Sequence, residues 1–150
     1  MAFSALVIEP INADVVLDKV GTDEDGAGLL FVGVVRDHNE GRSVKGVHYY
    51  AYEKMADLVL REIVEEATNS LGTDRIVVVH RLGRLKVGDI SVAIAVSSPH
   101  RANAYEASRF IIEEIKRRLP IWKKELYSDG NEEWVDGTIP VNLSQDVNQS

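Results

Sequence analysis

Two runs of the sequence decide the fold, Arg75-Ile-Val-Val-Val-His-Arg-Leu82 and Asp89-Ile-Ser-Val-Ala-Ile-Ala-Val-Ser97. Both are rich in β-branched residues, which pack well in extended strands. A turn region around Gly83 and Gly88 separates them. The pattern therefore predicts two strands joined by a short turn, not by the helical crossover that a parallel sheet needs.

Further elements are predicted on the N-terminal side of these runs. Asn12 can cap a short helix that carries Val15, Val16 and Leu17. Strands are expected over residues 3–9, 28–36 and 44–52, with a polar, glycine-rich loop over 21–28. Because residues 28–36 are almost continuously apolar, this strand is expected to be buried.

Two long helices complete the prediction. The first has a helical apolar stripe and ends at Gly72; its stripe is Met55, Val59, Ile63, Ala67 and Leu71. The second is expected to start with Ser98 as its cap and Pro99 at its first position, and to end at Pro120. Its core stripe is Ala104, Ala107, Ile111 and Ile115. A strand over 121–127 and a turn at 129–131 follow, so the order β-α-β-β-α-β-β-α-β predicts an α+β fold with hairpins.

Length and composition set the broad class. A chain of 150 residues, with 45% hydrophobic and 27% charged residues, is typical of one globular domain. We expect a single domain over residues 1–137 and a polar C-terminal tail over 138–150. No stretch is apolar enough to span a membrane and no signal peptide is recognisable, so a cytoplasmic location without membrane contact is expected.

Several kinds of chemistry are unexpected for this composition. The net charge of −7 argues against nucleic-acid binding. The chain has no cysteine, so any sulfur chemistry must take its sulfur from another molecule. The histidines show no metal-ligand spacing; they are His38, His48, His80 and His100. Neither a dinucleotide-binding glycine motif nor a serine-nucleophile motif is present, and no metal or cofactor is expected.

The stretch 116–124 holds five of the seventeen Lys and Arg residues in this acidic chain. Arg117 and Arg118 are ordinary at a helix C-terminus, where the helix dipole favours cations. Lys116 lies at the edge of the apolar stripe. Lys123 lies in the predicted strand after Pro120, about one helical turn and one change of chain direction away from Lys116. Two ammonium groups that face one pocket lower each other's pKa, and the pair suits phosphate binding, proton transfer or imine formation.

Three other cations are candidates for binding an anion. Arg36 ends an apolar strand, where it either reaches a site at the sheet edge or only marks the strand end. His100 and Arg101 lie in the first turn of their helix, where a cation opposes the dipole unless an anion is near. Arg101 and Lys116 are about 22 Å apart along one helix, so a site that uses both is shared across a homodimer.

Five motifs occur in order along the chain: Phe31-x-Gly33-x-Val35-Arg36-x-x-Asn39-x-Gly41, His80-Arg81-x-Gly83, Gly88-Asp89, His100-Arg101 and Lys116-x-x-x-Pro120-x-Trp122-Lys123-Lys124-Glu125. With these motifs the chain resembles the large, catalytic subunit family of molybdopterin synthase. The resemblance implies an α/β hammerhead-type domain with an additional antiparallel sheet. It also implies a sulfurtransferase of molybdenum cofactor synthesis, which converts cyclic pyranopterin monophosphate to molybdopterin by adding two dithiolene sulfurs.

The resemblance further implies partners and residue roles. A small ubiquitin-like subunit brings sulfur as a C-terminal thiocarboxylate, and two copies of each subunit form a heterotetramer around a homodimer of this chain. Lys116 is the expected catalytic lysine, with Lys123 beside it. The expected substrate-binding residues are Arg36, His100, Arg101, Lys124 and Glu125. Val34 stands where many relatives have a lysine, so no binding role is expected there.

Two other hypotheses remain at this point. The chain could be a non-catalytic docking or scaffold protein for a ubiquitin-like sulfur carrier, although such a protein has no need for Lys116 and Lys123 beside one pocket. It could also be an enzyme that uses a lysine imine for unrelated chemistry. Trapping with borohydride in the presence of substrate distinguishes the imine enzyme from the sulfurtransferase.

Overall fold

The computed structural model describes residues 2–135, and the predicted tail over 138–150 lies outside the described residues. The elements in chain order are β1 (Ala2–Val7), α1 (Ala13–Asp18), β2 (Ala27–Val34), β3 (His38–Asn39), β4 (Arg42–Ala51), α2 (Glu53–Leu71), β5 (Arg75–Arg81), β6 (Gly83–Lys86), β7 (Ile90–Ser98), α3 (Arg101–Arg118), β8 (Ile121–Tyr127) and β9 (Glu132–Trp134). The fold is α+β, as predicted, and β3, β6 and β9 are short strands that the sequence pattern did not indicate.

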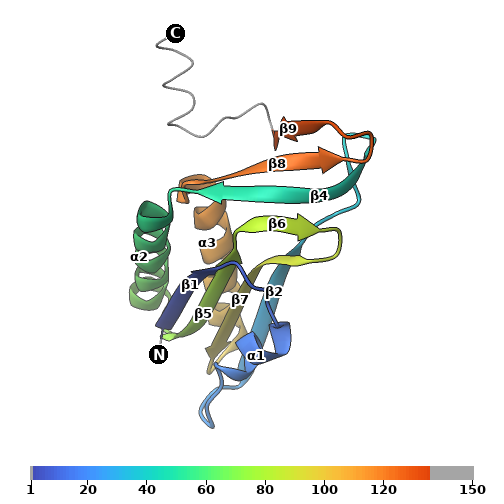
Figure 1. Ribbon diagram of the computed structural model, residues 1–150. Coiled ribbons are helices and arrows are strands. Elements are labelled where there is room, and N and C mark those ends of the chain that lie inside the picture. The colour runs from blue at the N-terminus through green and yellow to red at the C-terminus, as the bar shows by residue number, and fades with distance from the viewer. Residues whose placement is uncertain (1, 136–150) are drawn as a thin grey trace.

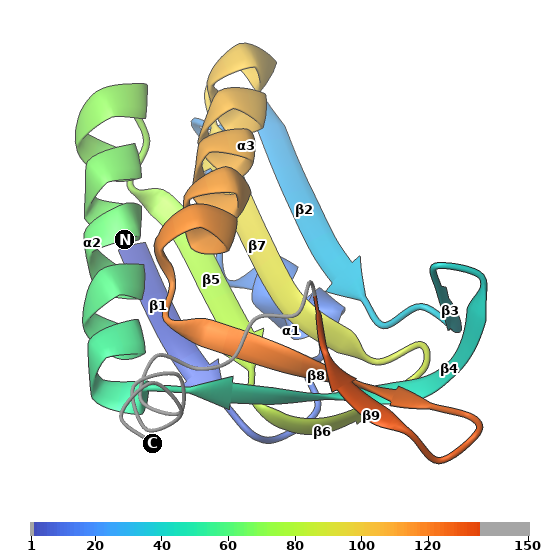
Figure 2. The same cartoon turned by 90° about the horizontal axis from the view of Figure 1, so that it is seen from above.

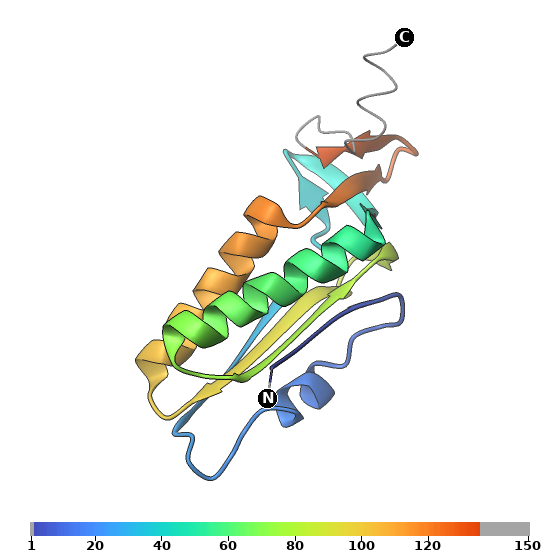
Figure 3. The same ribbon diagram turned by 90° about the vertical axis from the view of Figure 1, so that its left-hand side faces the viewer.

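The first sheet has the strand order β1-β5-β7-β2. β1 is parallel to β5, and the other neighbours are antiparallel. Helices α2 and α3 cover one face of this sheet, and the short α1 covers the other (Figures 1 and 3). Strands β5 and β7 are therefore central strands that are buried on both faces.

Alternation along β5 and β7 divides the core in two. Ile76 and Val78 of β5 face α2 and α3, whereas Val77 and Val79 face α1. Asn12 caps α1 as predicted, because its side chain accepts a hydrogen bond from the Val15 backbone N–H at 3.2 Å. The predicted stripe on α3 is confirmed by four buried side chains: Ala104, Ala107, Ile111 and Ile115.

Three local predictions were wrong. β2 is an edge strand, so Phe31 and Val34 are exposed although the run is apolar. In the predicted stripe of α2, Ile63 and Ala67 are buried and Val59 and Leu71 pack partly buried against the core, but Met55 is exposed. The buried residues of this helix are Ala56, Leu60, Ile63, Val64 and Ala67. His100, not Ser98, is the N-cap of α3, because β7 continues through Ser98.

The second sheet has five strands, in the order β3-β4-β8-β9. β6 also pairs with β4, which pairs with β8 as well. The second sheet lies across the end of the first sheet where α3 finishes and β8 begins (Figures 1 and 2). Gly46 allows β4 and β6 to approach closely, since a Cβ at this position would lie 2.4 Å from the Leu85 carbonyl oxygen. A third apolar cluster, which includes Val47, Tyr49 and Leu85, fills the space between the sheets.

Candidate active site

The cationic stretch 116–124 forms the corner between α3 and β8. Leu119 leaves the helical conformation while its backbone N–H still donates to the Ile115 carbonyl at 3.0 Å. Pro120 cannot continue the helix, and β8 starts one residue later. This sharp change of direction puts Lys116 and Lys123 on different elements that border the same space.

That space is a pocket of about 610 Å³. Its walls come from β4, α2, β5 and the α3–β8 corner, so they join segments far apart in the sequence. The lining residues include Lys116 and Lys123 together with Tyr49, Tyr52, Met55, His80, Trp122 and Val135. A volume of this size accommodates a small-molecule substrate.

Lys116 has the most unusual environment among these cations. Part of the residue is exposed, yet burial around its ammonium group lowers its pKa, and the charge of Lys123 lowers it further. Among the described residues 2–135, no carboxylate lies within ion-pair distance of Lys116. An amine with a lowered pKa can exchange protons with a substrate near neutral pH more readily than an ordinary surface lysine.

Unlike Lys116, Arg117 and Arg118 form ion pairs with glutamates. Arg118 bonds Glu66 of α2 at 2.8 Å and Glu114 of its own helix at 3.1 Å, while Arg117 pairs with Glu114. These contacts fix the end of α3 against α2 and offset both guanidinium charges. The positive charge left for an anion at this corner is therefore mainly that of the two lysines.

Lys123 and Glu125 share the inner face of β8, where they pair with Tyr49 and Val47 of β4. The Glu125 side chain is almost fully buried, and its Oε1 lies 4.0 Å from the Lys123 Nζ. Burial raises the pKa of Glu125, and the nearby charges of Lys123 and Arg36 act in the opposite direction. Arg36, exposed just after β2, is thus close enough to this group to influence its charge.

Lys124 lies on the opposite face of β8 from Lys123. Its Nζ lies over the ring of Trp134, 4.8 Å from the ring centroid, in a cation–π contact. It does not line the pocket. The structure therefore separates this predicted substrate-binding residue from the two lysines.

His100 and Arg101 lie at the far end of α3 from Lys116. Both are exposed, and the His100 side chain forms no capping hydrogen bond. The length of the helix keeps them about 22 Å from the pocket within one chain. One chain alone does not bring the predicted residues into one site.

The sequence analysis missed His80 and Tyr49 in the pocket wall. His80 is only 4% exposed, its Nδ1 is 3.0 Å from the Arg81 carbonyl oxygen, and burial lowers its pKa to about 4. The Tyr49 ring meets the His80 ring edge-on at a centroid distance of 5.3 Å. The available signal was a histidine directly after the four apolar residues 76–79 of a predicted strand.

Within residues 2–135, no group of three His, Asp or Glu side chains is arranged to hold a metal ion. None of the helices in the same range has the length and apolar character needed to cross a membrane.

Comparisons with known proteins agree on one family. The family described as "MoaE protein" matches residues 6–118. A molybdopterin synthase catalytic subunit from Halalkalibacterium halodurans is 44% identical over 131 residues, which cover 87% of this chain and 83% of that protein. The molybdopterin synthase catalytic subunit 1 of Mycobacterium tuberculosis is 42% identical over 133 residues, covering 89% and 90%.

A solved structure shows the same fold. The crystal structure of molybdopterin synthase from Staphylococcus aureus superimposes with a TM-score of 0.81 at 40% sequence identity. The match covers 86% of this chain and 93% of that chain.

Proposed function

Because the chain belongs to the MoaE protein family of molybdopterin synthase catalytic subunits, we propose that the pocket at the α3–β8 corner is its active site. The substrate is cyclic pyranopterin monophosphate, which leaves as molybdopterin after two dithiolene sulfurs are added. The observation that carries this proposal is the pairing of Lys116 with Lys123 across a pocket of substrate size.

The two lysines have different roles. Lys116, with its lowered pKa, transfers protons at the substrate carbons that receive sulfur. Lys123, beside Glu125, binds the substrate phosphate or the carboxylate end of the incoming tail together with Arg36. Glu125 attracts the Lys123 ammonium group over the 4.0 Å that separate Nζ from Oε1. Lys124, on the other face of β8, is left out of this pocket.

The sulfur comes from a small ubiquitin-like subunit that carries a C-terminal thiocarboxylate. The absence of cysteine in this chain supports a donor of this kind, since no side chain here can form a persulfide. The pocket is bordered by aromatic and apolar side chains as well as cations, so an extended tail can enter beside the substrate.

Two copies of the chain complete each site. His100 and Arg101 of one protomer reach the pocket of its partner, because α3 is too long for them to reach their own. The edge strand β2 supports this arrangement: Phe31 and Val34 are exposed, and Leu29, Phe31 and Tyr105 line a groove between β2 and α3. With two small subunits the assembly is a heterotetramer, which works in the cytoplasm.

The test is reconstitution of the reaction. The purified chain is mixed with thiocarboxylated small subunit and cyclic pyranopterin monophosphate, and dithiolene-bearing pterin is measured. Lys116→Ala is expected to abolish product formation, while its unfolding transition remains the same as that of the unsubstituted chain. Lys19→Ala, an exposed lysine beyond α1, is the matched control and is expected to retain full activity.

Other results would replace this proposal. Tight binding of the small subunit without any product indicates the docking or scaffold role. Full activity of Lys116→Ala removes that residue from the chemistry. A borohydride-trapped adduct on Lys116 with substrate alone indicates an imine enzyme.

A further inference from the structure

We propose that His80 is a positioning residue for Lys116: its neutral ring presents Nε2 to the pocket as a fixed hydrogen-bond acceptor for the lysine amino group. This inference rests on the proposed function of the pocket. His80 lies near the end of β5, in the wall that also contains Lys116 and Tyr49.

The tautomer of His80 follows from its backbone contact. The Arg81 carbonyl oxygen, 3.0 Å from Nδ1, can only accept a hydrogen bond, so Nδ1 carries the proton. Burial and the positive charge of Lys116 disfavour a second proton on the ring. Nε2 therefore keeps a free lone pair at neutral pH.

The orientation of the ring is fixed from a second side. Tyr49 packs against His80 at an interplanar angle of 79°, and Ser91 lies near the Tyr49 hydroxyl. The Ser91 hydroxyl donates to the Gly33 carbonyl at 3.2 Å, which anchors Ser91 to β2. A chain of contacts from β2 through β7 and β4 thus holds the imidazole in one position.

A neutral acceptor suits a catalytic lysine better than a carboxylate does. An acidic partner at this place would favour the ammonium form and raise the pKa of Lys116, as it does for paired lysines generally. An imidazole nitrogen can orient the amino group without adding a negative charge. Lys116 then stays directed into the pocket and still exchanges protons.

The competing interpretation is that His80 only fills the core and satisfies the Arg81 carbonyl. Two substitutions separate the interpretations, because each keeps one nitrogen position of the ring. His80→Asn places an amide near Nδ1 and keeps the donor to Arg81. His80→Gln reaches the Nε2 position and keeps an acceptor toward Lys116.

The experiment compares kcat and KM of the reconstituted heterotetramer for the two variants, with thermal unfolding as the check on folding. His80→Asn is expected to lower kcat about 10- to 100-fold with KM nearly unchanged, since a displaced catalytic group costs rate. His80→Gln is expected to restore kcat to within about threefold of the unsubstituted chain. Native kcat in a folded His80→Asn variant would overturn the proposal, as would a folded His80→Gln variant that is as slow as His80→Asn.

A second readout does not depend on turnover. Acetic anhydride acylates lysines at rates that depend on their free amine, and peptide mass spectrometry follows Lys116 separately from Lys19. His80→Asn is expected to change the Lys116 rate several-fold, with His80→Gln restoring it and Lys19 unaffected. An unchanged Lys116 rate in His80→Asn would overturn the positioning role even if reconstitution showed no synthase activity. If His80→Asn does not fold, His80→Gln decides: native kcat supports the acceptor role and a large loss overturns it.

Discussion

The charge of Lys123 lowers the pKa of Lys116 across the pocket at the α3–β8 corner, although the two residues lie on different elements. Replacing Lys123 with Met removes this repulsion and keeps most of the side-chain volume. The pKa of Lys116 is then expected to rise, because a like charge that disfavoured its ammonium form is gone. The pH dependence of Lys116 acetylation, followed by peptide mass spectrometry, measures this shift toward higher pH.

Lys124→Met is the matched control for this measurement. Lys124 is the next residue along β8, but its ammonium group lies over Trp134 on the other face of the strand. The pKa of Lys116 is expected to stay the same in this variant. Equal shifts in the Lys123 and Lys124 variants would show that the general charge of the strand, and not the shared pocket, sets the pKa.

The same two lysines differ in their expected effect on activity. Lys123→Ala removes a cation that faces the substrate, and kcat/KM is expected to fall about 100-fold or more. Lys124→Ala removes the contact with Trp134 and leaves the pocket lining intact, so activity stays within about threefold and stability falls by at most about 1 kcal/mol. Steady-state kinetics and urea unfolding of both variants test this, and a large loss of activity in Lys124→Ala would return that residue to the substrate site.

His80 makes stability depend on pH. Its pKa falls from 6.5 to about 4 on folding, so the unfolded chain binds a proton that the folded chain excludes. The stabilisation is complete above pH 6.5 and is lost progressively as the pH falls to about 4, by about 3 kcal/mol in total. Urea unfolding at several pH values should show a smaller loss in His80→Gln, and parallel curves would contradict the buried, neutral state of His80.

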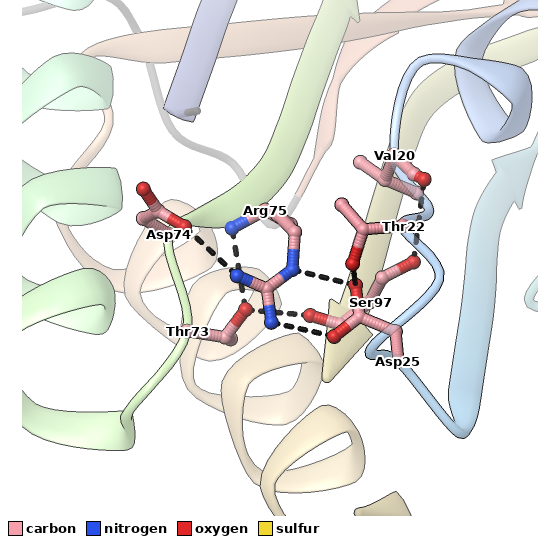
Figure 4. Close-up of polar contacts among 7 residues, drawn as sticks. All are labelled: Val20, Thr22, Asp25, Thr73, Asp74, Arg75 and Ser97. Atoms are coloured by element: carbon pink, nitrogen blue, oxygen red, sulfur yellow. Dashed lines mark hydrogen bonds and ion pairs between the residues drawn. The ribbon is translucent and has the colours of Figure 1, made fainter. Parts of the chain in front are cut away.

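The loop before β2 is fastened by an ion pair between Asp25 and Arg75 (Figure 4). Arg75 donates from Nε and Nη2 to the two carboxylate oxygens, each at 2.5 Å, and Thr22 donates to the same carboxylate at 3.0 Å. These hydrogen bonds lower the pKa of Asp25, with the bond from Arg75 as the largest cause. The Asp25 side chain is only 3% exposed, so its loss leaves Arg75 without its main partner in a largely buried place.

Asp25→Ala is therefore expected to lower the midpoint of thermal unfolding by about 5 °C or more at pH 7. Asp57→Ala breaks an exposed pair with Arg61 at 2.7 Å and is expected to change stability by at most about 0.5 kcal/mol. Because the pKa of Asp25 is lowered on folding, its contribution is present above the usual carboxyl pKa and is lost as the pH falls through the lowered value. Equal midpoints for the two variants would contradict a structural role for the Asp25 pair.

Local patterns predicted the elements whose signals are short-range. β8 occupies the residues that Pro120 and the following alternation indicated, and Gly72 ends α2 in the left-handed conformation with a φ of 74°. Met55 was wrongly placed in the core stripe of α2, because it has the same spacing as the buried Ile63 and Ala67. Only packing against the sheet selects between the two faces of this helix.

Local sequence patterns could not predict which distant segments pair with each other. β6 is four residues long and exists because β4 lies beside it, which Gly46 permits. The stretch 116–124 indicated an anion site, but only the strand register shows that Lys123 faces the pocket and Lys124 does not. His80 was missed for the same reason, since its neighbours in the pocket wall come from β4 and α3.

The separation of Arg101 from Lys116 along α3 yields the sharpest test of a site shared between protomers. Arg101→Ala and Lys116→Ala are each expected to inactivate a homodimer. In a mixed dimer, the site that contains the intact Lys116 receives its Arg101 from the other protomer, so one of the two sites is complete. Random mixing by co-unfolding and refolding, or by co-expression, is then expected to restore about a quarter of the unsubstituted activity, as two-fold symmetry requires.

The control is a mixture of Lys116→Ala with Lys123→Ala. This mixture stays inactive if both lysines of a site come from one protomer, whereas activity returns if they come from two. No recovery in the Arg101 mixture, with dimers present by size-exclusion chromatography, would place Arg101 outside the site.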